Sequence, residues 1–426
     1  MSMNSMKLLL ASATAISGLA MSAGTAFAQE ITYMCSSDGT ECATAREIFD
    51  RFQEENPGVT VKIDEVPYKA IVESLPVQLA AGDAPDMAKV TDLGGLSEYY
   101  LDLSPYVDAA YWEKNFGGTL DWYRKGPEDK GIYGLHSQLT ITGAYINKTL
   151  FEQAEVEVPG PDATWEDWAA ATRDVAKKTE TQFPMAMDRS GHRIAGPAIS
   201  DGAKLLDENG VGILVDEGFT TYVKKFVEWN NDGTMARDVW ASTGGSAYQA
   251  ADKEFINGQL VYYYSGSWQV AKMDEQIGDA FDWEVVGTPC GVGGCTGMPG
   301  GAGIVGFAST EHPELVAKAI DYLAQEANYA EMTAKTKNIP AHAAVAAKGV
   351  EYSDASPAAA AALNAWSAQV SKISPVAYAY QGYKNNRAMF NISVERITQA
   401  IVGELTVEEA MDRAKEDLKQ ALAETK

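Results

Sequence analysis

The spacing of apolar residues near the amino-terminal end switches repeatedly between the periods of strands and helices. Ile48, Phe49 and Phe52 recur on one helix face that ends at Pro57, whereas Val59 and its neighbours alternate with polar residues as in a strand. The predicted elements are, in order, a strand at 31–34, a helix at 43–55, a strand at 59–66, a helix at 68–81 that includes Pro76, and a strand that ends near Asp92. This alternation is typical of a parallel sheet covered by helices, so we expect an α/β fold.

Helix-start signals mark the middle and the carboxyl-terminal part of the chain. Thr164 and Thr406 are each followed three residues later by an acid, Asp167 and Glu409, which is the spacing of a capping box. Further helical segments are expected at 313–325 and around 358–362. The sequence shows no internal repeat and no long polar tail, which favours compact domains.

The first 28 residues carry the pattern of a secretory signal peptide. Lys7 supplies a positive charge, residues 8–20 form a short apolar run, and residues 26–28 give the small-x-small motif that precedes cleavage. The first cysteine, Cys35, lies beyond the predicted cut, so no lipid attachment at a new amino terminus is expected. We therefore expect a mature protein that begins at Gln29 and resides in the periplasm.

The charge balance excludes several classes of partner. The chain carries 34 Lys and Arg residues against 59 Asp and Glu residues, a formal net charge of −25 at pH 7. Such a surface does not favour nucleic acid or anionic lipid, because both reward clustered cations. What remains after removal of the predicted signal is long enough for two domains, and we expect a monomer.

Cysteines in an exported chain indicate disulfides before any other chemistry. The four cysteines permit three connectivities, and we favour the local pairs Cys35–Cys42 and Cys290–Cys295 because both intervening loops are short and rich in turn residues. A zinc site is the alternative, but the spacings match no common finger and the chain has only four histidines. We expect no metal and no cofactor.

Five segments carry a family pattern in a fixed order along the chain. They are FQEENPGVTV at 52–61, LAAGDAPDM at 79–87, GIYGLHSQLTITGAYINKTLF at 131–151, FINGQLVYYYSGSW at 255–268, and GELTVEEAMDRA at 403–414. With these motifs behind a predicted signal peptide, the chain resembles the extracellular solute-binding proteins of ABC importers, the family that includes maltose-binding protein. It departs from the usual pattern at His136, where proline is common, and at Ile146, which is inserted between Tyr145 and Asn147.

The resemblance implies a two-lobe periplasmic binding protein fold of type II, with the ligand in a cleft between the lobes. By this resemblance the chain crosses between lobes near Ile141, near 289–297 and near 339–342. The implied lobes are 29–140 with 298–338, and 141–297 with 339–426. Closure of the hinge around a ligand is the expected motion.

Two sources supply candidate ligand-binding residues. Ligands of α/β sheets lie beyond the carboxyl ends of strands, which points to Ser37, Asp38 and Asp92, although Asp38 or Thr40 could instead cap the following helix. The resemblance adds Trp268, whose flat indole matches the apolar face of a sugar ring. The full set of candidates is Ser37, Asp38, Tyr68, Asp92, Gln138, Thr140, Ser190, Gly191, Thr243, Trp268, Gly301, Tyr383 and Arg387.

The nature of the ligand stays open between two classes. A sugar, glycoside or short oligosaccharide is favoured by Trp268, Asp92 and the hydroxyl-rich loops. A phosphorylated or sulfonated polyol is the alternative, and it would use the cationic residues Arg189, His192, Arg193 and Arg387. The alternative for Arg387 is a surface salt bridge.

An enzyme is disfavoured, because the chain has no HExxH, GxSxG, Walker or GxGxxG motif and its four histidines are scattered. An extracytoplasmic glycoside hydrolase stays the enzymatic alternative, since the spacing of its two acids would be set only by the fold. The expected protein partner is an inner-membrane ABC permease, with a chemoreceptor as the alternative.

Overall fold

The computed structural model describes residues 29–37, 39–352 and 354–424. The predicted signal peptide and Asp38 therefore lie outside the described residues. Within those ranges, no helix is both long and apolar enough to cross a lipid bilayer.

The strands of the described chain form one connected sheet system. Their order is β2-β1-β3-β8-β4-β6-β5, with β7 paired to β4. Their bounds are β1 Gln29–Cys35, β2 Val59–Glu65, β3 Met87–Val90, β4 Gly134–Asn147, β5 Phe183–Met187, β6 Leu260–Gly266, β7 Trp283–Val286 and β8 Pro299–Gly306. The predicted parallel arrangement is present between β1, β2 and β3, but β8 runs antiparallel to β3 and to β4, so the sheet is mixed.

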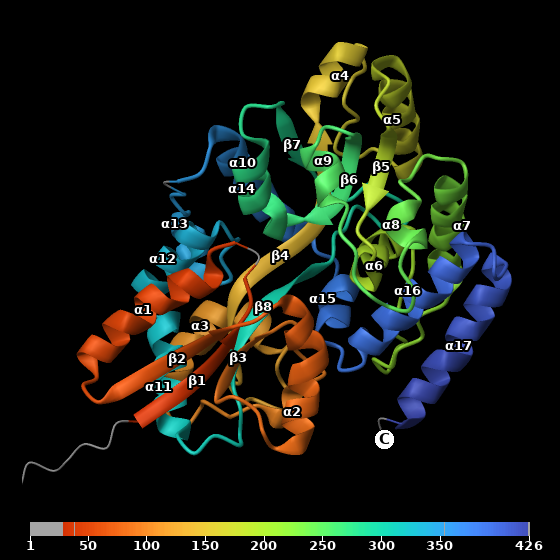
Figure 1. Ribbon diagram of the computed structural model, residues 1–426. Coiled ribbons are helices and arrows are strands. Elements are labelled where there is room, and N and C mark those ends of the chain that lie inside the picture. The colour runs from red at the N-terminus through yellow and green to blue at the C-terminus, as the bar shows by residue number, and fades with distance from the viewer. Residues whose placement is uncertain (1–28, 38, 353, 425–426) are drawn as a thin grey trace, which may run out of the picture.

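Strand β4 belongs to two sheets. Its residues 134–141 pair with β8, whereas 142–147 pair with β6 and β7. We call the part built on β1, β2, β3, β8 and the first half of β4 lobe 1. The part built on β5, β6, β7 and the second half of β4 is lobe 2. Figure 1 shows β4 running from one lobe into the other.

Helices cover both lobes. Lobe 1 carries α1 Glu41–Glu55, α2 Leu75–Ala81, α3 Ala109–Leu120, α11 Pro313–Ala324, α12 Glu326–Thr336 and α13 Ala343–Lys348. With lobe 2 lie α4 Lys148–Ala154, α5 Trp165–Thr179, α6 Gly191–Ser200, α7 Glu217–Asn231, α8 Asp238–Ala241, α9 Asp252–Ile256, α10 Val270–Ile277, α14 Pro357–Gln369, α16 Asn386–Ile401 and α17 Val407–Glu424. Helix α15 (Pro375–Gly382) packs against both α6 and β8, and so lies between the lobes (Figure 1).

Local sequence signals explain most of the helix ends. Thr164 and Asp167 form the predicted capping box, and Thr406 and Glu409 exchange the same two hydrogen bonds. The predicted helix at 68–81 is confirmed, since the backbone is helical throughout this range, although part of it is π-helical. A π-helical turn, η1 (Ala70–Ser74), runs directly into α2, and Pro76 lies in the first turn of α2, where the helix changes from π to α geometry.

Two apolar clusters form the interior. One belongs to lobe 1 and contains Ile48, Phe49 and Phe52, the predicted buried face of α1. The other fills lobe 2 and continues into lobe 1 through Trp122, whose indole N–H donates to the Tyr378 carbonyl oxygen at 3.0 Å. Since burial of one large apolar side chain contributes roughly 1.5–3 kcal/mol, this shared cluster holds the lobes against each other.

Both disulfides join the predicted local pairs, Cys35 with Cys42 and Cys290 with Cys295. The first links the end of β1 to the first turn of α1. In the second, the two sulfurs lie close to the Asp162 carboxylate, but they are bonded to each other and are not thiolates available to a metal.

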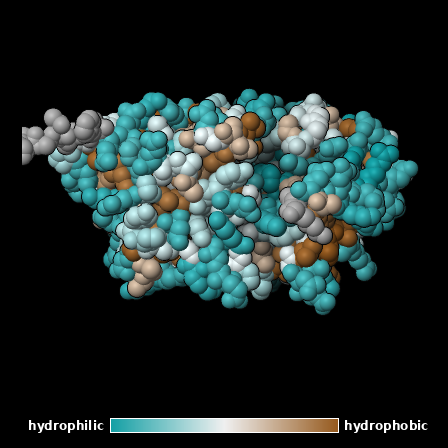
Figure 2. All heavy atoms as spheres, turned by 90° about the horizontal axis from the view of Figure 1, so that it is seen from below, coloured by the Kyte–Doolittle hydropathy of each residue, from teal (hydrophilic) through white to brown (hydrophobic). Residues whose placement is uncertain are grey.

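The surface reflects the acidic composition. Figure 2, seen from below, shows a mostly hydrophilic face on which apolar areas are separate from one another. Such a face suits a protein with many charged residues.

Candidate functional site

The lobes touch where several predicted site residues gather. Arg387, at the start of α16, donates from Nη2 to the hydroxyl of Thr91, which follows β3, at 3.2 Å. In the loop between β1 and α1, a Cβ placed on Gly39 would lie 3.5 Å from the Cβ of Ala271 on α10. Both contacts join lobe 1 to lobe 2, so the residues around them line the junction between the lobes.

The first group at this junction consists of Tyr68, Thr91, Asp92 and Arg387. The Tyr68 hydroxyl lies 3.1 Å from the Thr91 hydroxyl, and one Asp92 oxygen accepts a hydrogen bond from the Gly95 N–H at 3.2 Å. Asp92 thus closes the turn that follows it, and it also lies close enough to Arg387 for their charges to interact.

The charges in this group influence each other. Burial raises the pKa of Asp92, although Arg387 and the Gly95 amide act in the opposite direction. Burial alone would lower the pKa of Arg387, but Tyr68 and Asp92 outweigh it and the pKa is raised, so the guanidinium stays charged.

The second group consists of His192, Arg193 and Trp268 in lobe 2. The guanidinium carbon of Arg193 lies 4.0 Å from the centre of the Trp268 ring, a cation–π contact. Arg193 Nη1 is 3.0 Å from His192 Nδ1, and His192 Nε2 is 3.0 Å from the Pro299 carbonyl oxygen. A guanidinium can only donate, so Nδ1 accepts and Nε2 carries the proton that is donated to Pro299.

His192 connects the two groups electrostatically. Burial, together with the positive charges of Arg193 and Arg387, lowers the pKa of His192 to about 3. The imidazole is therefore neutral at physiological pH and acts as a fixed hydrogen-bonding group between two cations.

Asp188 is the buried acidic partner of Arg193 in this second group. It follows β5 directly, is fully buried, and lies 3.5 Å from Arg193 Nε through one carboxylate oxygen. Its oxygens also accept hydrogen bonds from the side chains of Tyr248, Tyr263 and Ser265 and from the N–H of Ala251, at 2.6–3.1 Å. Because so many donors converge on it, this carboxylate has a fixed position.

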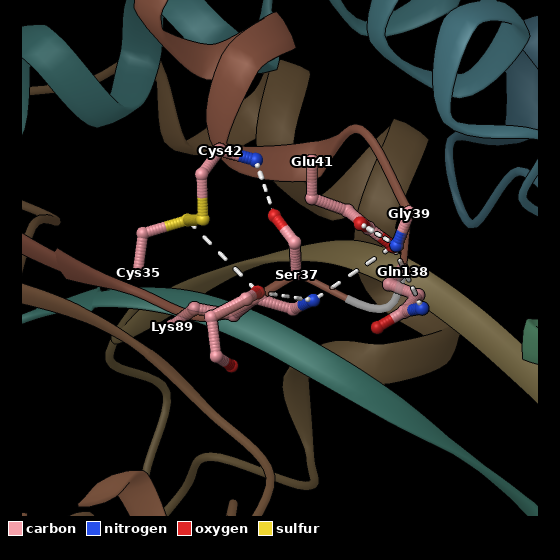
Figure 3. Close-up of a disulfide and its surroundings, with 8 residues drawn as sticks. Cys35, Ser37, Gly39, Glu41, Cys42, Lys89 and Gln138 are labelled. Atoms are coloured by element: carbon pink, nitrogen blue, oxygen red, sulfur yellow. Dashed lines mark hydrogen bonds and ion pairs between the residues drawn. A yellow bond between two sulfur atoms is a disulfide. The ribbon is translucent and has the colours of Figure 1, made fainter. Parts of the chain in front are cut away.

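The third group lies under the loop between β1 and α1 (Figure 3). The Ser37 hydroxyl accepts a hydrogen bond from the Cys42 N–H in the first turn of α1 at 3.0 Å, whereas Thr40 makes no side-chain capping bond. Glu41 accepts from the Gly39 N–H at 2.8 Å, and its other oxygen lies 4.0 Å from Lys89 Nζ. The disulfide between Cys35 and Cys42 closes this loop.

Gln138 extends the third group onto β4. Its side-chain nitrogen lies 3.4 Å from Glu41 Oε1 and 3.3 Å from Asn338 Oδ1, and the residue is 4% exposed. Lys89 is equally buried and donates to the Ser36 carbonyl oxygen at 3.0 Å. Polar side chains from β3, β4 and α1 thus meet beneath the loop.

The predicted glycines have backbone roles. Gly301 has a φ of +118°, and a Cβ there would lie 1.6 Å from the Gln138 carbonyl oxygen, where the pairing register between β4 and β8 shifts. A Cβ on Gly191 would lie 2.4 Å from the backbone of Phe390, so this glycine lets α6 pack against α16. Thr140 is buried in β4 opposite Gly300.

Three other predicted residues lie apart from the three groups. Ser190 is the half-buried N-cap residue of α6 and makes no side-chain capping bond. Thr243 is half-buried in the largely exposed segment 242–250. The Tyr383 hydroxyl accepts a hydrogen bond from the Gly212 N–H at 3.0 Å and so holds a neighbouring loop.

Arg189 serves the fold. Its guanidinium donates to the carbonyl oxygens of Trp240, Gly245 and Ala247 and to the Thr398 hydroxyl, at 2.5–3.2 Å, and the residue is fully buried. These bonds fix the segment between α8 and α9. Its inclusion among cations available to a ligand is therefore wrong.

Sequence reasoning missed the roles of Thr91, Asp188, Glu41 and Lys89. Thr91 and Asp188 each follow a strand directly, so the rule that selected Asp92 would have selected them as well. No local signal marks the contact between Glu41 and Lys89, because the two residues are distant in the sequence.

Comparison with known proteins adds the family context. The model for the family described as "Bacterial extracellular solute-binding protein" matches residues 36–330. "Maltodextrin-binding protein MdxE" of Bacillus subtilis is 25% identical over 344 residues, which cover 74% of this chain and 77% of that relative. "Multiple sugar-binding protein" of Streptococcus mutans is 25% identical over 150 residues, 34% of this chain and a third (33%) of that relative.

Solved structures resemble the whole described chain. The ABC substrate-binding protein Lmo0181 from Listeria monocytogenes, in complex with cycloalternan, has a TM-score of 0.78 at 18% identity and covers 93% of this chain and 99% of its own. Maltose-bound MalE3 of T. maritima has a TM-score of 0.74 at 17% identity, with 92% and 100% covered. These likenesses confirm the predicted two-lobe α/β fold.

Proposed function

Since this chain belongs to the bacterial extracellular solute-binding protein family, as its motifs predicted, we propose that it binds a carbohydrate between its two lobes. The sugar or short oligosaccharide is then delivered to the membrane permease of an ABC importer. The protein works in the periplasm as a monomer after removal of residues 1–28, and it catalyses no reaction.

The observation that carries the proposal is the line of groups across the lobe junction. Asp92 and Tyr68 come from lobe 1, and Arg193, Trp268 and Arg387 come from lobe 2. The Asp92 carboxylate can accept hydrogen bonds from sugar hydroxyls, the arginines can donate to them, and the Tyr68 phenol can do either. The half-buried indole of Trp268 offers a flat apolar surface to a sugar ring. The names of similar proteins mention maltodextrin, cycloalternan and maltose, which supports a carbohydrate as the ligand of this chain.

Lobe closure follows from the position of these groups. A ligand that contacts both Asp92 and Trp268 binds better when the lobes are together, and it shifts the equilibrium by that difference in affinity. We propose lobes of 29–140 with 298–338 and of 141–297 with 339–426, except that α13 belongs with the first lobe because it packs against α3 and α12. The change of partner along β4 at Ile141 supports the first crossing.

The test is a thermal shift of the mature protein with sugars, oligosaccharides, polyols and their phosphate esters, followed by calorimetry on every hit. At about 100 times its Kd, a ligand stabilises the folded state by roughly 2.7 kcal/mol. Trp268→Ala should weaken carbohydrate binding by about 2 kcal/mol, roughly thirtyfold in Kd, because a buried aromatic contact is lost.

Tyr106→Ala is the matched control, since it removes an aromatic side chain that is 43% exposed on lobe 1 and belongs to none of the three groups. It should leave the Kd unchanged. Stabilisation by amino acids or peptides alone, or equal binding by the Trp268→Ala protein, would contradict the proposal.

A further inference from the structure

We infer that Asp188 and Asp92 are specificity-determining residues: each neutralises one arginine at the lobe junction, and together they reject anionic solutes. The inference rests on the proposed function and narrows its ligand to an uncharged polyhydroxy compound. It decides against the phosphorylated or sulfonated polyol that the cationic residues left open.

The first neutral pair is Asp188 with Arg193. The carboxylate oxygen lies 3.5 Å from Arg193 Nε, and Arg193 is 9% exposed while Asp188 is fully buried. Attraction between opposite charges is strong at this distance and depth, because little water separates them. An incoming phosphate would have to compete with a carboxylate that is already in place.

Asp188 cannot turn away to admit a second anion. Four donors besides the arginine hold its two oxygens, two from β6 and two from the loop before α9. The carboxylate therefore repels any anion that approaches the exposed edge of Arg193. A neutral hydroxyl meets no such repulsion and can accept from the same guanidinium.

The second neutral pair is Asp92 with Arg387. The two residues come from opposite lobes, and Arg387 donates to the hydroxyl of Thr91, the residue directly before Asp92, at 3.2 Å. At this position the positive charge of Arg387 favours the ionised Asp92 carboxylate. An anion that bound Arg387 would lie beside the Asp92 carboxylate. The Arg387 guanidinium can thus donate hydrogen bonds to a neutral ligand, while the nearby Asp92 carboxylate offsets its positive charge.

Three lysines near the junction also have acidic partners. Their partners are Glu41 for Lys89, Asp252 for Lys272, and Asp274 for Lys337, the last at 2.8 Å. A phosphate or sulfonate ester would therefore meet no uncompensated cation among them. These pairs disfavour an anionic ligand. A cation that already has an acidic partner offers an anion little further attraction, and the anion would lose its water on entering the site.

The experiment releases each arginine and asks whether an anion takes the vacated place. Asp188→Asn and Asp92→Asn are each compared with the wild-type protein by calorimetry at low ionic strength, with inorganic phosphate as the probe. Trehalose and trehalose 6-phosphate are a matched second pair of probes. Asp417→Asn is the control, because it removes the same charge from the Arg396–Asp417 pair (2.6 Å) between α16 and α17.

The wild-type and Asp417→Asn proteins should show no saturable phosphate binding. Each junction variant should bind phosphate with a Kd at least about tenfold below the limit that the titration sets for the control. A purely structural role for the two aspartates would lower stability without this gain. Asp188→Asn has lost a carboxylate that holds four donors, so circular dichroism and Tm are measured first, and Asp92→Asn decides if that variant does not fold.

Two results would overturn the inference. One is a wild-type protein that binds trehalose 6-phosphate or phosphate more tightly than the neutral sugars. The other is a folded Asp92→Asn protein with no more phosphate affinity than the control. Failure of the proposed function is distinct: the wild-type protein would then bind no carbohydrate, while the gain of phosphate affinity in the variants would still be measured.

Discussion

Removal of the disulfide between Cys35 and Cys42 should weaken ligand binding, whereas removal of the one between Cys290 and Cys295 should not. The first disulfide closes the loop that carries the Ser37 cap and lies over Lys89 and Glu41 at the lobe junction. The perturbation is a double substitution to serine in each pair, which leaves side chains of similar size.

The structure sets the expected loss of stability. The sequence separations are 7 residues for the first disulfide and 5 for the second. In the chain-entropy description, loops of this length contribute about 2 kcal/mol each, so the two double variants should be destabilised almost equally. A difference in affinity between them then cannot be attributed to global stability.

The effect on affinity comes from loop order. If one residue of 36–41 is no longer held in place and must be ordered on binding, the cost is about 1–2 kcal/mol, a five- to thirtyfold rise in Kd. The second disulfide lies at the carboxyl end of α6, where the Gly293 N–H donates to the Ser200 carbonyl oxygen at 2.7 Å. His192 and Arg193 lie at the other end of that helix, so their positions should persist.

The assay combines urea unfolding, which gives the free energy of unfolding, with calorimetry using the carbohydrate found in the thermal-shift screen. Both are run on the two double-serine variants and on the wild-type protein. Equal Kd values for the Cys35/Cys42 variant and the wild type would refute the reasoning, as would an equal loss of affinity in both variants.

Two further predictions concern stability. Gly301→Ala should lower the free energy of unfolding, measured in urea, by about 1–3 kcal/mol. The reason is that the φ of +118° and the nearby Gln138 carbonyl oxygen both disfavour a Cβ at this position. A loss below about 0.5 kcal/mol, the scale of an ordinary surface change, would show that the strands relax around the new side chain. The pKa of His192 is lowered from 6.5 to about 3, so the unfolded chain binds more protons and stability should fall as pH decreases from 6.5 towards 3. His192→Gln should flatten that part of the curve of unfolding free energy against pH, and an unchanged curve would count against the assigned neutral imidazole.

Features that depend on neighbouring residues could be predicted from the sequence. The capping boxes at Thr164 and Thr406 need only a partner three residues away, and the cysteine pairs need only a short loop. The parallel pairing of β1 with β2 follows from a strand, a helix and a strand in succession. In each case the interacting groups are close in the chain, so few alternatives compete.

Features that depend on distant residues were beyond such reasoning. Strand β8 enters between β3 and β4 from more than 150 positions later in the chain, and it reverses the direction of the sheet there. Trp268 was selected for its ring, but nothing near it in sequence announces that Arg193 lies on that ring. Arg189 and Arg193 look alike in sequence, and only their partners separate a residue that fixes a loop from one at the lobe junction.

The sharing of β4 between two sheets has a mechanical consequence. A flexible linker would let two bodies separate and reorient freely, whereas here the same 14-residue strand is bonded sideways into both. In β4, relative motion of the lobes is therefore taken up as torsion along one extended segment, which keeps its hydrogen bonds on either side. A twist of one sheet against the other needs only small changes at many residues of β4, whereas pulling the lobes apart would break the strand pairing on both sides.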